Sequence, residues 1–432
     1  MLFLITTYCL LFAFIAFRKI EWAIFIIVAT LPSYLIRFQI FDVPLTLLET
    51  MILILFIVFL IKNRFSWWSA FRSSPFFWPI VAILIAATVS VFISPNLHGA
   101  LGVYKAYFVE PLLFFVILIA EIKSRRGVEG LIWALGVSAI YLGVIAVAQK
   151  IGGLEAVLGP LGYVPGAFLN PNGSVDRAVS ILGYPNALGL FLGPIIILFA
   201  GFLFWERKNL LFQIVKIFII VLSFLTIILA KSEGAILSVV VVLLVWAFFN
   251  KKTRLYALTF IVFCAIILSF SQPLLSIIIQ KITLQDYSGF VRRLIWGESW
   301  KMLSDNWFFG AGLAGYQIKI TPYHLKTFEI FLYPHNIVLN FWSEVGLLGL
   351  LSFGWLFIKF FWLNMTSLSL RRRGLGRGYD LIIAATLIAV MAQIIIHGLV
   401  DAPYFKNDLS VLFWLMVAMA AIVNKVYKVE SS

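Results

Sequence analysis

The sequence predicts an all-α, polytopic integral membrane helical bundle, and three observations lead to this prediction. Of the 432 residues, 62% are hydrophobic and only 12% are charged, whereas a soluble domain carries about 25% charged residues. The hydrophobic residues form long continuous stretches, unlike the alternating strands of a membrane β-barrel. Because a helix that crosses a bilayer needs about 20 apolar residues, the chain has enough for roughly a dozen spans.

Thirteen apolar stretches follow one another along the chain. Only a tight turn separates the first two, so the count falls to twelve if one of them is re-entrant or lies flat in the membrane. We therefore expect 12–13 transmembrane helices. The stretches lie near residues 1–17, 20–38, 43–61, 76–94, 103–121, 129–149, 186–204, 209–230, 233–250, 255–278, 334–363, 379–400 and 407–425.

The stretches divide the chain into transmembrane regions and two substantial outside loops. The first loop is rich in Gly and Pro, which predicts an irregular conformation. The second contains the amphipathic segment 292–305, which predicts a helix at the membrane interface. The expected regions are N-terminal transmembrane helices in 1–150, the first loop in 151–185, central transmembrane helices in 186–278, the large loop in 279–333 and C-terminal transmembrane helices in 334–425.

Lys and Arg are unequally distributed between the two sides of the predicted membrane. If the turn at Arg18 and Lys19 is cytoplasmic and the spans alternate, 21 of the 33 basic residues lie on the cytoplasmic side. The short loops of the opposite side hold six, and six more lie in the long loop, where the positive-inside rule does not apply in the same way. This distribution predicts a cytoplasmic C-terminus and explains most of the net charge of +14 without a nucleic-acid partner.

The motifs of several common enzyme classes are missing from the sequence. The patterns GxxxxGK[ST], HExxH, GxSxG and CxxC do not occur, so hydrolysis by a P-loop, a zinc site or a serine elbow has no support. An Asp-x-Asp element is also absent, which argues against a nucleotide-sugar transferase that holds its donor through a metal ion. We expect neither a metal site nor a cofactor.

Ionisable and polar residues gather instead at the outer ends of several predicted spans. Such residues in or at the edge of a membrane are functional candidates by default. Two of them, four residues apart near the end of the stretch 379–400, are predicted to share one helix face. The set comprises Arg177, Lys231, Glu233, Arg292, Arg293, His335, Asn336, Glu344, His397 and Asp401, of which His397 and Asp401 are that pair.

These residue types suit the transfer of a group away from a diphosphate ester. Arg and Lys bind phosphate oxygens, and a histidine can take the proton of an attacking hydroxyl. The same side chains also fit simpler roles as lipid-headgroup anchors, helix caps or solvated loop charges. From the residues alone, the prediction is a polytopic membrane protein with an outward-facing polar site.

Five segments resemble the O-antigen ligase and O-antigen polymerase superfamily of bacterial membrane glycosyltransferases, in the same order along the chain. The most specific begins at His335, HNIVLNFWSEVGLLGL, with His-Asn followed by two spaced glycines. The resemblance extends over roughly residues 175–415. The other segments are RAVSILGYPNALGLFLG (177–193), KSEGAILSVVVVLLVW (231–246), RRLIWGESWKMLSDNWFFGAGLAGY (292–316) and HGLVDAPYFKNDLSVLFW (397–414).

The resemblance implies a glycan transfer at the outer face of the bacterial inner membrane. The donor would be a glycan on undecaprenyl diphosphate, and the acceptor a hydroxyl of a lipid A core, another glycan chain or a protein. The reaction would be inverting and independent of metal. The resemblance implies that His335 is the base or positions the acceptor and that Arg292 binds the diphosphate. The further substrate-binding candidates are Arg177, Arg293, Lys231, Asp401 and Asn336.

Glu233 departs from the resemblance. The corresponding Ser-Arg-Gly-Ala element has an arginine where this chain has Glu233, and a carboxylate cannot bind phosphate as a guanidinium does. Lys231 or Arg293 would have to supply the positive charge, and our hypothesis is that Lys231 does so.

Two other functions stay open at this point. A transporter or flippase for a lipid-linked glycan would place charged residues around a mid-membrane cavity between related halves. A non-catalytic scaffold for envelope assembly would tolerate the loss of His335 and Arg292. Ligase and polymerase differ mainly in the acceptor, so the sequence does not separate these two activities.

Overall fold

The described part of the chain is almost entirely helical, which confirms the all-α prediction. The computed structural model describes residues 2–40, 43–63, 66–158, 176–205, 209–249, 253–325, 328–370 and 378–431. Within these ranges, β structure is confined to one antiparallel hairpin of β1 (Arg37–Ile40) and β2 (Val43–Thr46). Much of the predicted first loop, 159–175, lies outside the described residues.

Helices occupy all thirteen predicted apolar stretches. Seven of the described helical segments are long and apolar enough to cross a membrane, and the chain is thus a multi-pass membrane protein. The seven spans are Leu97–Glu121, which contains α6 (Leu97–Tyr104), η2 (Lys105–Val109) and α7 (Glu110–Glu121), and parts of α8 (Arg125–Leu158), α9 (Pro185–Trp205), α10 (Leu210–Leu229), α16 (Ile337–Leu370), α17 (Gly378–Gly398) and α18 (Asn407–Ser431).

The remaining helices are shorter. They surround the long spans or lie in the large loop. Those before α6 are α1 (Leu2–Arg18), α2 (Ile20–Ala29), η1 (Leu31–Leu35), α3 (Leu47–Asn63), α4 (Ser66–Arg72) and α5 (Phe77–Ile93). Those after α10 are α11 (Glu233–Phe249), α12 (Arg254–Phe270), α13 (Gln272–Ile282), α14 (Tyr287–Asp305), α15 (Tyr316–Ile320) and η5 (Thr321–Tyr323).

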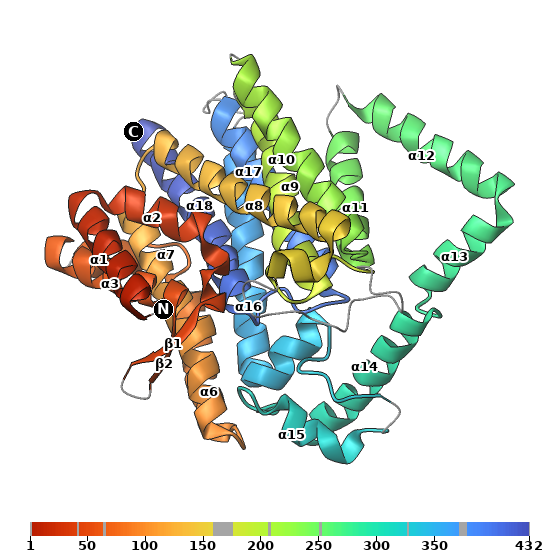
Figure 1. Ribbon diagram of the computed structural model, residues 1–432, viewed down its shortest axis with the longest axis horizontal. Helices are drawn as coiled ribbons and strands as arrows, with labels where there is room; N and C mark the ends of the chain where they lie inside the picture. The colour runs from red at the N-terminus through yellow and green to blue at the C-terminus, as the bar shows by residue number, and fades with distance from the viewer. Residues whose placement is uncertain are drawn as a thin grey trace.

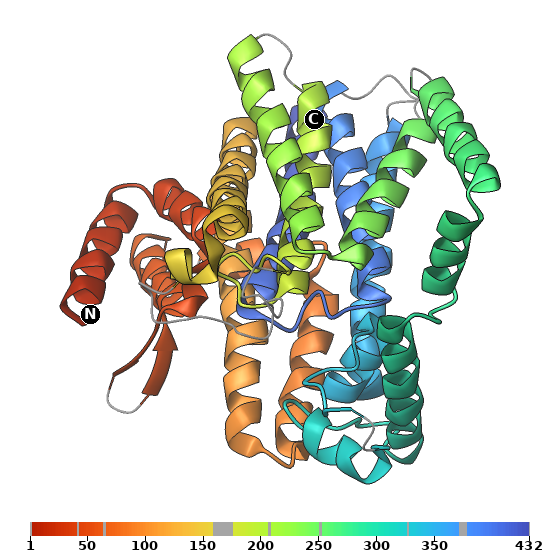
Figure 2. The same ribbon diagram turned by 45° about the vertical axis from the view of Figure 1, so that its right-hand side comes forward.

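The long spans stand between two flanks of different character. Figures 1 and 2 show α1–α3 on one flank and α12–α14 on the opposite one, with α8–α11 and α16–α18 between them. The centre is formed by α18 and α9, whose spans are 89% and 83% buried, whereas the span of α10 is only 33% buried. The apolar outer face of α10 is therefore available to lipid.

The stretch 20–38 is not a single span, contrary to the prediction. Helix α2 has ten residues, which is about 15 Å and too short for a hydrocarbon core of about 30 Å. Pro32 lies in the first turn of η1, the 3-10 helix that follows α2, and proline lacks the N–H that would continue an α-helix. The chain then enters the hairpin, so 43–61 begins as a strand. Short apolar runs of strand and helix look alike in sequence.

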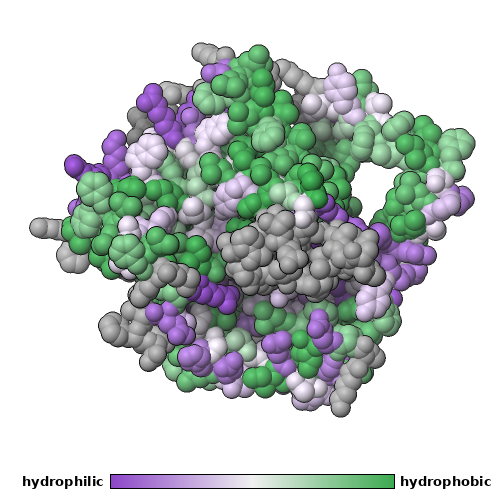
Figure 3. Space-filling view, viewed as in Figure 1, coloured by the Kyte–Doolittle hydropathy of each residue, from purple (hydrophilic) through white to green (hydrophobic). Residues whose placement is uncertain are grey.

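The stretch 255–278 is also not one straight helix. It breaks after Phe270, and the axis turns by 112° between α12 and the helical segment that follows. Pro273 lies in the first turn of α13, a position that proline favours at a helix start. We call α12 and α13 together the arm. No residue of α13 is buried, and Figure 3 shows an open gap between the arm and the rest of the molecule.

Helix α16 is broken near its start, and a loop fills the break. Gly346 has φ +66° and ψ −176°, which interrupts the helical hydrogen bonds. The N–H of Leu347 instead donates to the carbonyl of Phe308 (2.8 Å), and the N–H of Ala311 to the carbonyl of Ser343 (2.6 Å). The buried carboxylate of Glu344 accepts a hydrogen bond from the N–H of Ala314 (2.8 Å). Irregular backbone inside a membrane protein is tolerated where other parts of the chain satisfy it in this way.

Replacing Gly346 by alanine should destabilise the protein. A Cβ at this position would lie 2.6 Å from the carbonyl oxygen of Phe308, at a φ that favours glycine. We expect a cost of about 1–3 kcal/mol from backbone strain alone, seen as a lower thermal midpoint in detergent. Gly354→Ala is the matched control, because a Cβ there meets nothing within 4 Å and alanine favours a helix. Equal midpoints for the two variants would contradict the role of the break.

Candidate functional site

Two short segments at helix ends form the centre of the site. One is His335 and Asn336, just before α16, and the other is Leu399 to Asp401, just after α17. Nδ1 of His335 lies 3.0 Å from Oδ1 of Asp401, and the amide nitrogen of Asn336 donates to the carbonyl of Leu399 (3.0 Å). These two bonds hold the segments side by side.

The backbone of His335 is held in an unusual conformation. Its φ is +49°, a region that few residues other than glycine adopt. Asn336, the next residue, accepts hydrogen bonds at Oδ1 from the N–H groups of Val338 and Leu339 and so caps α16. Both ends of the Asn336 amide are therefore engaged in positioning its histidine neighbour. Strained residues of this kind gather at functional sites.

Helix α14 fixes both segments from one side. Arg292 donates from Nε to the carbonyl of Val400 (3.0 Å) and from a terminal nitrogen to Oγ of Ser288 (2.7 Å). Trp296 donates from Nε1 to the carbonyl of Pro334 (2.9 Å). Arg292 and Trp296 are four residues apart and thus lie on one face of the helix. This explains why an arginine and a tryptophan stand four residues apart here, since their two acceptors directly precede Asp401 and His335.

Asp401 is a buried, ionised carboxylate. Burial by itself raises the pKa of this carboxyl, but the hydrogen bond with His335, with smaller effects from other neighbours such as the N–H of Ala402, holds the pKa well below its usual range. An ionised carboxylate accepts hydrogen bonds only, so Nδ1 of His335 carries the proton. The basic nitrogen of the neutral ring is then Nε2. The His335 side chain is 30% exposed, and Nε2 makes no hydrogen bond within the described ranges.

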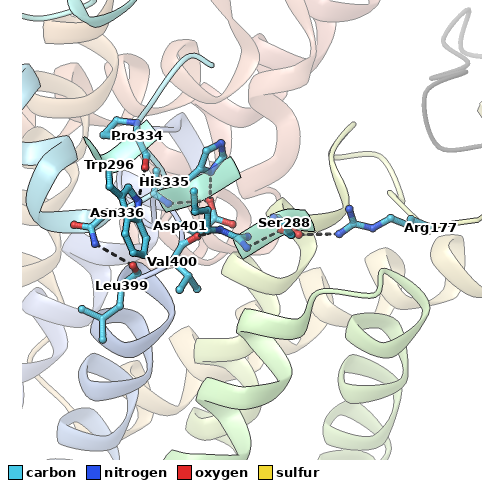
Figure 4. A network of polar contacts seen from close by, with 12 residues as sticks. Arg177, Ser288, Trp296, Pro334, His335, Asn336, Leu399, Val400 and Asp401 are labelled. Carbon is cyan, nitrogen blue, oxygen red and sulfur yellow. Dashed lines mark hydrogen bonds and ion pairs between the residues drawn. The ribbon is translucent and has the colours of Figure 1, made fainter. Parts of the chain in front are cut away.

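Arg177 lies across the site from this pair. It donates from Nε to the carbonyl of Ala230 (3.0 Å) and from a terminal nitrogen to Oδ1 of Asn186 (2.9 Å). Burial lowers the pKa of Arg177, and the charges of Asp176, Glu233, Arg292 and Asp401 also act on it. An arginine nevertheless stays protonated. Figure 4 shows Arg177 on the far side of Ser288, with its guanidinium directed toward the cluster around His335 and Asp401.

Gln149 holds the turn that follows Arg177, a role that no local sequence pattern indicates. Its Oε1 accepts the N–H groups of Val179 (3.3 Å) and Ser180 (2.8 Å), and its Nε2 donates to the carbonyl of Ser180 (2.7 Å). Gln149 is fully buried in α8. Residues 149 and 180 come close only in the folded chain, so a single sequence does not reveal this contact.

The remaining lysines of the site are paired with carboxylates. Lys231 contacts Oδ1 of Asp176 (2.5 Å). Glu233, at the position where the resemblance implies an arginine, instead contacts Nζ of Lys281 (2.5 Å) at the end of the arm. Lys281 is also 3.8 Å from Oδ2 of Asp286. No local sequence pattern marks Lys281, because 48 residues separate it from its partner.

One sequence prediction is wrong, and the structure shows where two other residues of the predicted set lie. Helix α17 ends at Gly398, so His397 and Asp401 do not share a helix face. The His397 ring is buried against Gly234, where a Cβ would lie 3.1 Å from Cδ2. Glu344 lies beyond His335 in α16, where it is buried and accepts the N–H of Ala314 from the loop before α15. Arg293 is exposed on α14, and its part in substrate binding stays a prediction.

The site thus combines a partly exposed histidine side chain with several cationic side chains. Within the described ranges, no three side chains of His, Cys, Asp or Glu come together as a metal site would require. The positive charges described at the site belong to arginine and lysine side chains. Arg292 offers five N–H donors in a planar fork, of which the two hydrogen bonds above use two. Such an arrangement can bind an oxyanion beside a base.

Comparison with known proteins agrees with the resemblance seen in the motifs. Residues 218–354 match the family model described as "O-Antigen ligase". The chain is also 24% identical over 303 residues to a protein described as "O-antigen ligase" from Salmonella typhimurium (strain LT2), covering 66% of this chain and 69% of the relative. The resemblance to the O-antigen ligase and polymerase superfamily is therefore confirmed. The family match contains Arg292 and His335 but not Arg177 or Asp401.

The ionised state of Asp401 predicts how stability depends on pH. Because the folded pKa lies below the value of about 3.9 for an unfolded aspartate, this carboxylate stabilises the protein fully above about pH 4. The contribution is lost as the pH falls further, since the unfolded chain then binds the proton first. Asp401→Asn should therefore lower the free energy of unfolding near neutrality by about 2 kcal/mol, the value of one charged hydrogen bond, and with it the thermal midpoint. This difference from the wild type should shrink in acid. Midpoints measured from neutral to acid pH test this, and parallel curves would contradict it.

Proposed function

We propose that this protein, a relative of O-antigen ligases, is a bacterial inner-membrane glycosyltransferase of the ligase or polymerase type. The donor is a glycan on undecaprenyl diphosphate, and the acceptor is a hydroxyl of a lipid A core, another glycan chain or a protein. The site faces the outer side of the membrane and the C-terminus lies in the cytoplasm, as the distribution of Lys and Arg predicts.

The hydrogen bond between His335 and Asp401 is the observation that carries the proposal. It leaves Nε2 of His335 as an exposed base, and Arg292 is anchored beside it through Val400. A transporter does not need a histidine with a fixed tautomer, and a scaffold does not need a fixed cation next to it. A transfer that removes a proton while a diphosphate leaves needs both.

The proposed reaction is a single inverting displacement. The acceptor oxygen bonds to the anomeric carbon as the bond from that carbon to the diphosphate oxygen breaks, and undecaprenyl diphosphate leaves with the bond electrons. The hydroxyl proton passes to Nε2 of His335. Asp401 stabilises the imidazolium that results, as a buried carboxylate does in catalytic triads. The proton is then released to water.

Arginine side chains balance the charge of the leaving group in this proposal. Arg292 and Arg177 bind the diphosphate from two sides, and no metal ion takes part. Arg293 and Lys231 add positive charge at the rim of the site. Asn336 acts by positioning His335, because its amide groups already bond to the backbone. Planar guanidinium groups suit phosphate oxygens better than a single ammonium does.

His335→Ala should nearly abolish release of undecaprenyl diphosphate. A general base contributes about 10²–10⁴-fold to a rate, so a loss of that size is expected. The measurement uses purified protein in nanodiscs with a lipid-linked oligosaccharide and a panel of hydroxyl acceptors. His98→Ala is the control, because His98 is an exposed histidine at the start of α6.

The outcome separates the candidate functions. A wild-type rate that His335→Ala leaves unchanged would keep the enzyme but remove this site. No release by the wild type with any acceptor would favour the transporter or the scaffold. If the preferred acceptor is another glycan repeat the protein is a polymerase, and if it is a lipid A core or a protein it is a ligase.

A further inference from the structure

The ion pair between Glu233 and Lys281 has a position that stability does not explain. It joins the first residue of α11 to the end of the arm, over 2.5 Å, and the side chains are 58% and 40% exposed. Exposed ion pairs contribute about 0–1 kcal/mol to stability. The ion pair is therefore weak, and a ligand that arrives from solution or from the membrane surface can replace one of its two partners.

The pair lies at the edge of the site described above. Arg177 donates a hydrogen bond to the carbonyl of Lys231 (3.3 Å), two residues before Glu233, and Gly234, the residue after Glu233, lies against the His397 ring. On the other side, Lys281 approaches Asp286, which caps α14 by accepting the N–H of Gly289 (3.1 Å). Lys281 thus lies between the arginine of the first loop and the helix that carries the second arginine.

The carboxylate of Glu233 is an anion beside cationic side chains, of which Lys281 is in direct contact with it. A carboxylate and a phosphate accept the same charge-assisted hydrogen bonds from an ammonium group, but a diphosphate carries more charge. Lysine has a flexible stem and rotatable donors, so its amine can pass from one acceptor to the other without moving the backbone. Lys231 is placed differently, because its amine contacts Asp176.

We propose that Lys281 is a ligand of the donor diphosphate and that Glu233 holds the Lys281 amine at the site until the donor arrives. This inference rests on the proposed function and names a binding residue for it. On binding, the hydrogen bond from Lys281 moves from the carboxylate of Glu233 to a phosphate oxygen. No covalent bond changes in this step. The arm thereby contributes a cation to a site whose other cations come from the bundle and α14.

Two neutral substitutions of the same pair should act in opposite directions. Lys281→Gln should weaken binding of undecaprenyl diphosphate about tenfold, the effect of losing one charge-assisted hydrogen bond. Glu233→Gln should tighten binding about threefold, because it removes a competing acceptor and an exposed like charge. Dissociation constants for undecaprenyl diphosphate are measured with the full-length protein in nanodiscs, together with KM for the lipid-linked donor. We expect KM to change and kcat to stay nearly constant.

Three further variants make the test specific. Lys301→Gln removes the same charge from an exposed position nine residues after Arg292, half a turn away around α14, and should bind like the wild type. Lys281→Arg keeps the cation and should restore binding. Lys231→Gln tests the lysine that the sequence suggested in place of the arginine. It should weaken binding less than Lys281→Gln does.

The results distinguish a ligand from a structural pair. If Glu233→Gln and Lys281→Gln weaken binding equally, the pair only holds the arm in place and the inference is wrong. It is also wrong if Lys281→Gln binds like the wild type while Arg292→Gln is impaired, and in that case the proposed function stands. If the wild-type protein does not bind undecaprenyl diphosphate, both the proposed function and this inference fail.

Discussion

The candidate site depends on one helix that hydrogen-bonds to two backbone carbonyls. Arg292 and Trp296, one turn apart on α14, bond to the residues that directly precede Asp401 and His335. These two residues are 66 positions apart in the chain, and neither lies within a helix. Besides α14, the Asn336–Leu399 and His335–Asp401 bonds join these two segments. The unusual φ of His335 persists because contacts on both sides of it are fixed.

Three pairs of opposite charge lie at the candidate site. Lys231 contacts Asp176, Lys281 contacts Glu233, and His335 contacts Asp401. The first two pairs are exposed and contribute little to stability, whereas the third is tied to a buried carboxylate. The site therefore has a rigid centre, which suits proton transfer, and a rim of exchangeable pairs, which suits the arrival of a diphosphate. An acidic residue in place of the implied arginine is compatible with this rim because a lysine accompanies it.

The sequence predicted the fold class and the central residues, but not the contacts that organise them. Composition and the length of apolar stretches follow directly from burial in lipid, so the helices were found. The hairpin and the break before Pro273 were missed, because hydropathy averages over the short segments where direction changes. His335 and Arg292 came from spaced motifs, which reflect local geometry. Lys281 and Gln149 escaped notice, since their partners lie 48 and 31 residues away and nothing in the local pattern marks them.

The break in α16 connects the rigid centre to the rest of the large loop. After α14 ends, the chain from Phe308 to Ala314 bonds to α16 on both sides of Gly346. Helix α14 is thus anchored at its first half to the segments of His335 and Asp401, and after its second half to the helix that His335 precedes. If α16 were continuous, the backbone groups of residues 343 and 347 would bond within the helix. They would then no longer bond to Ala311 and Phe308 of the loop. Gly346, which interrupts α16, therefore helps to place Arg292 beside His335, although it is not a neighbour of either residue in the sequence.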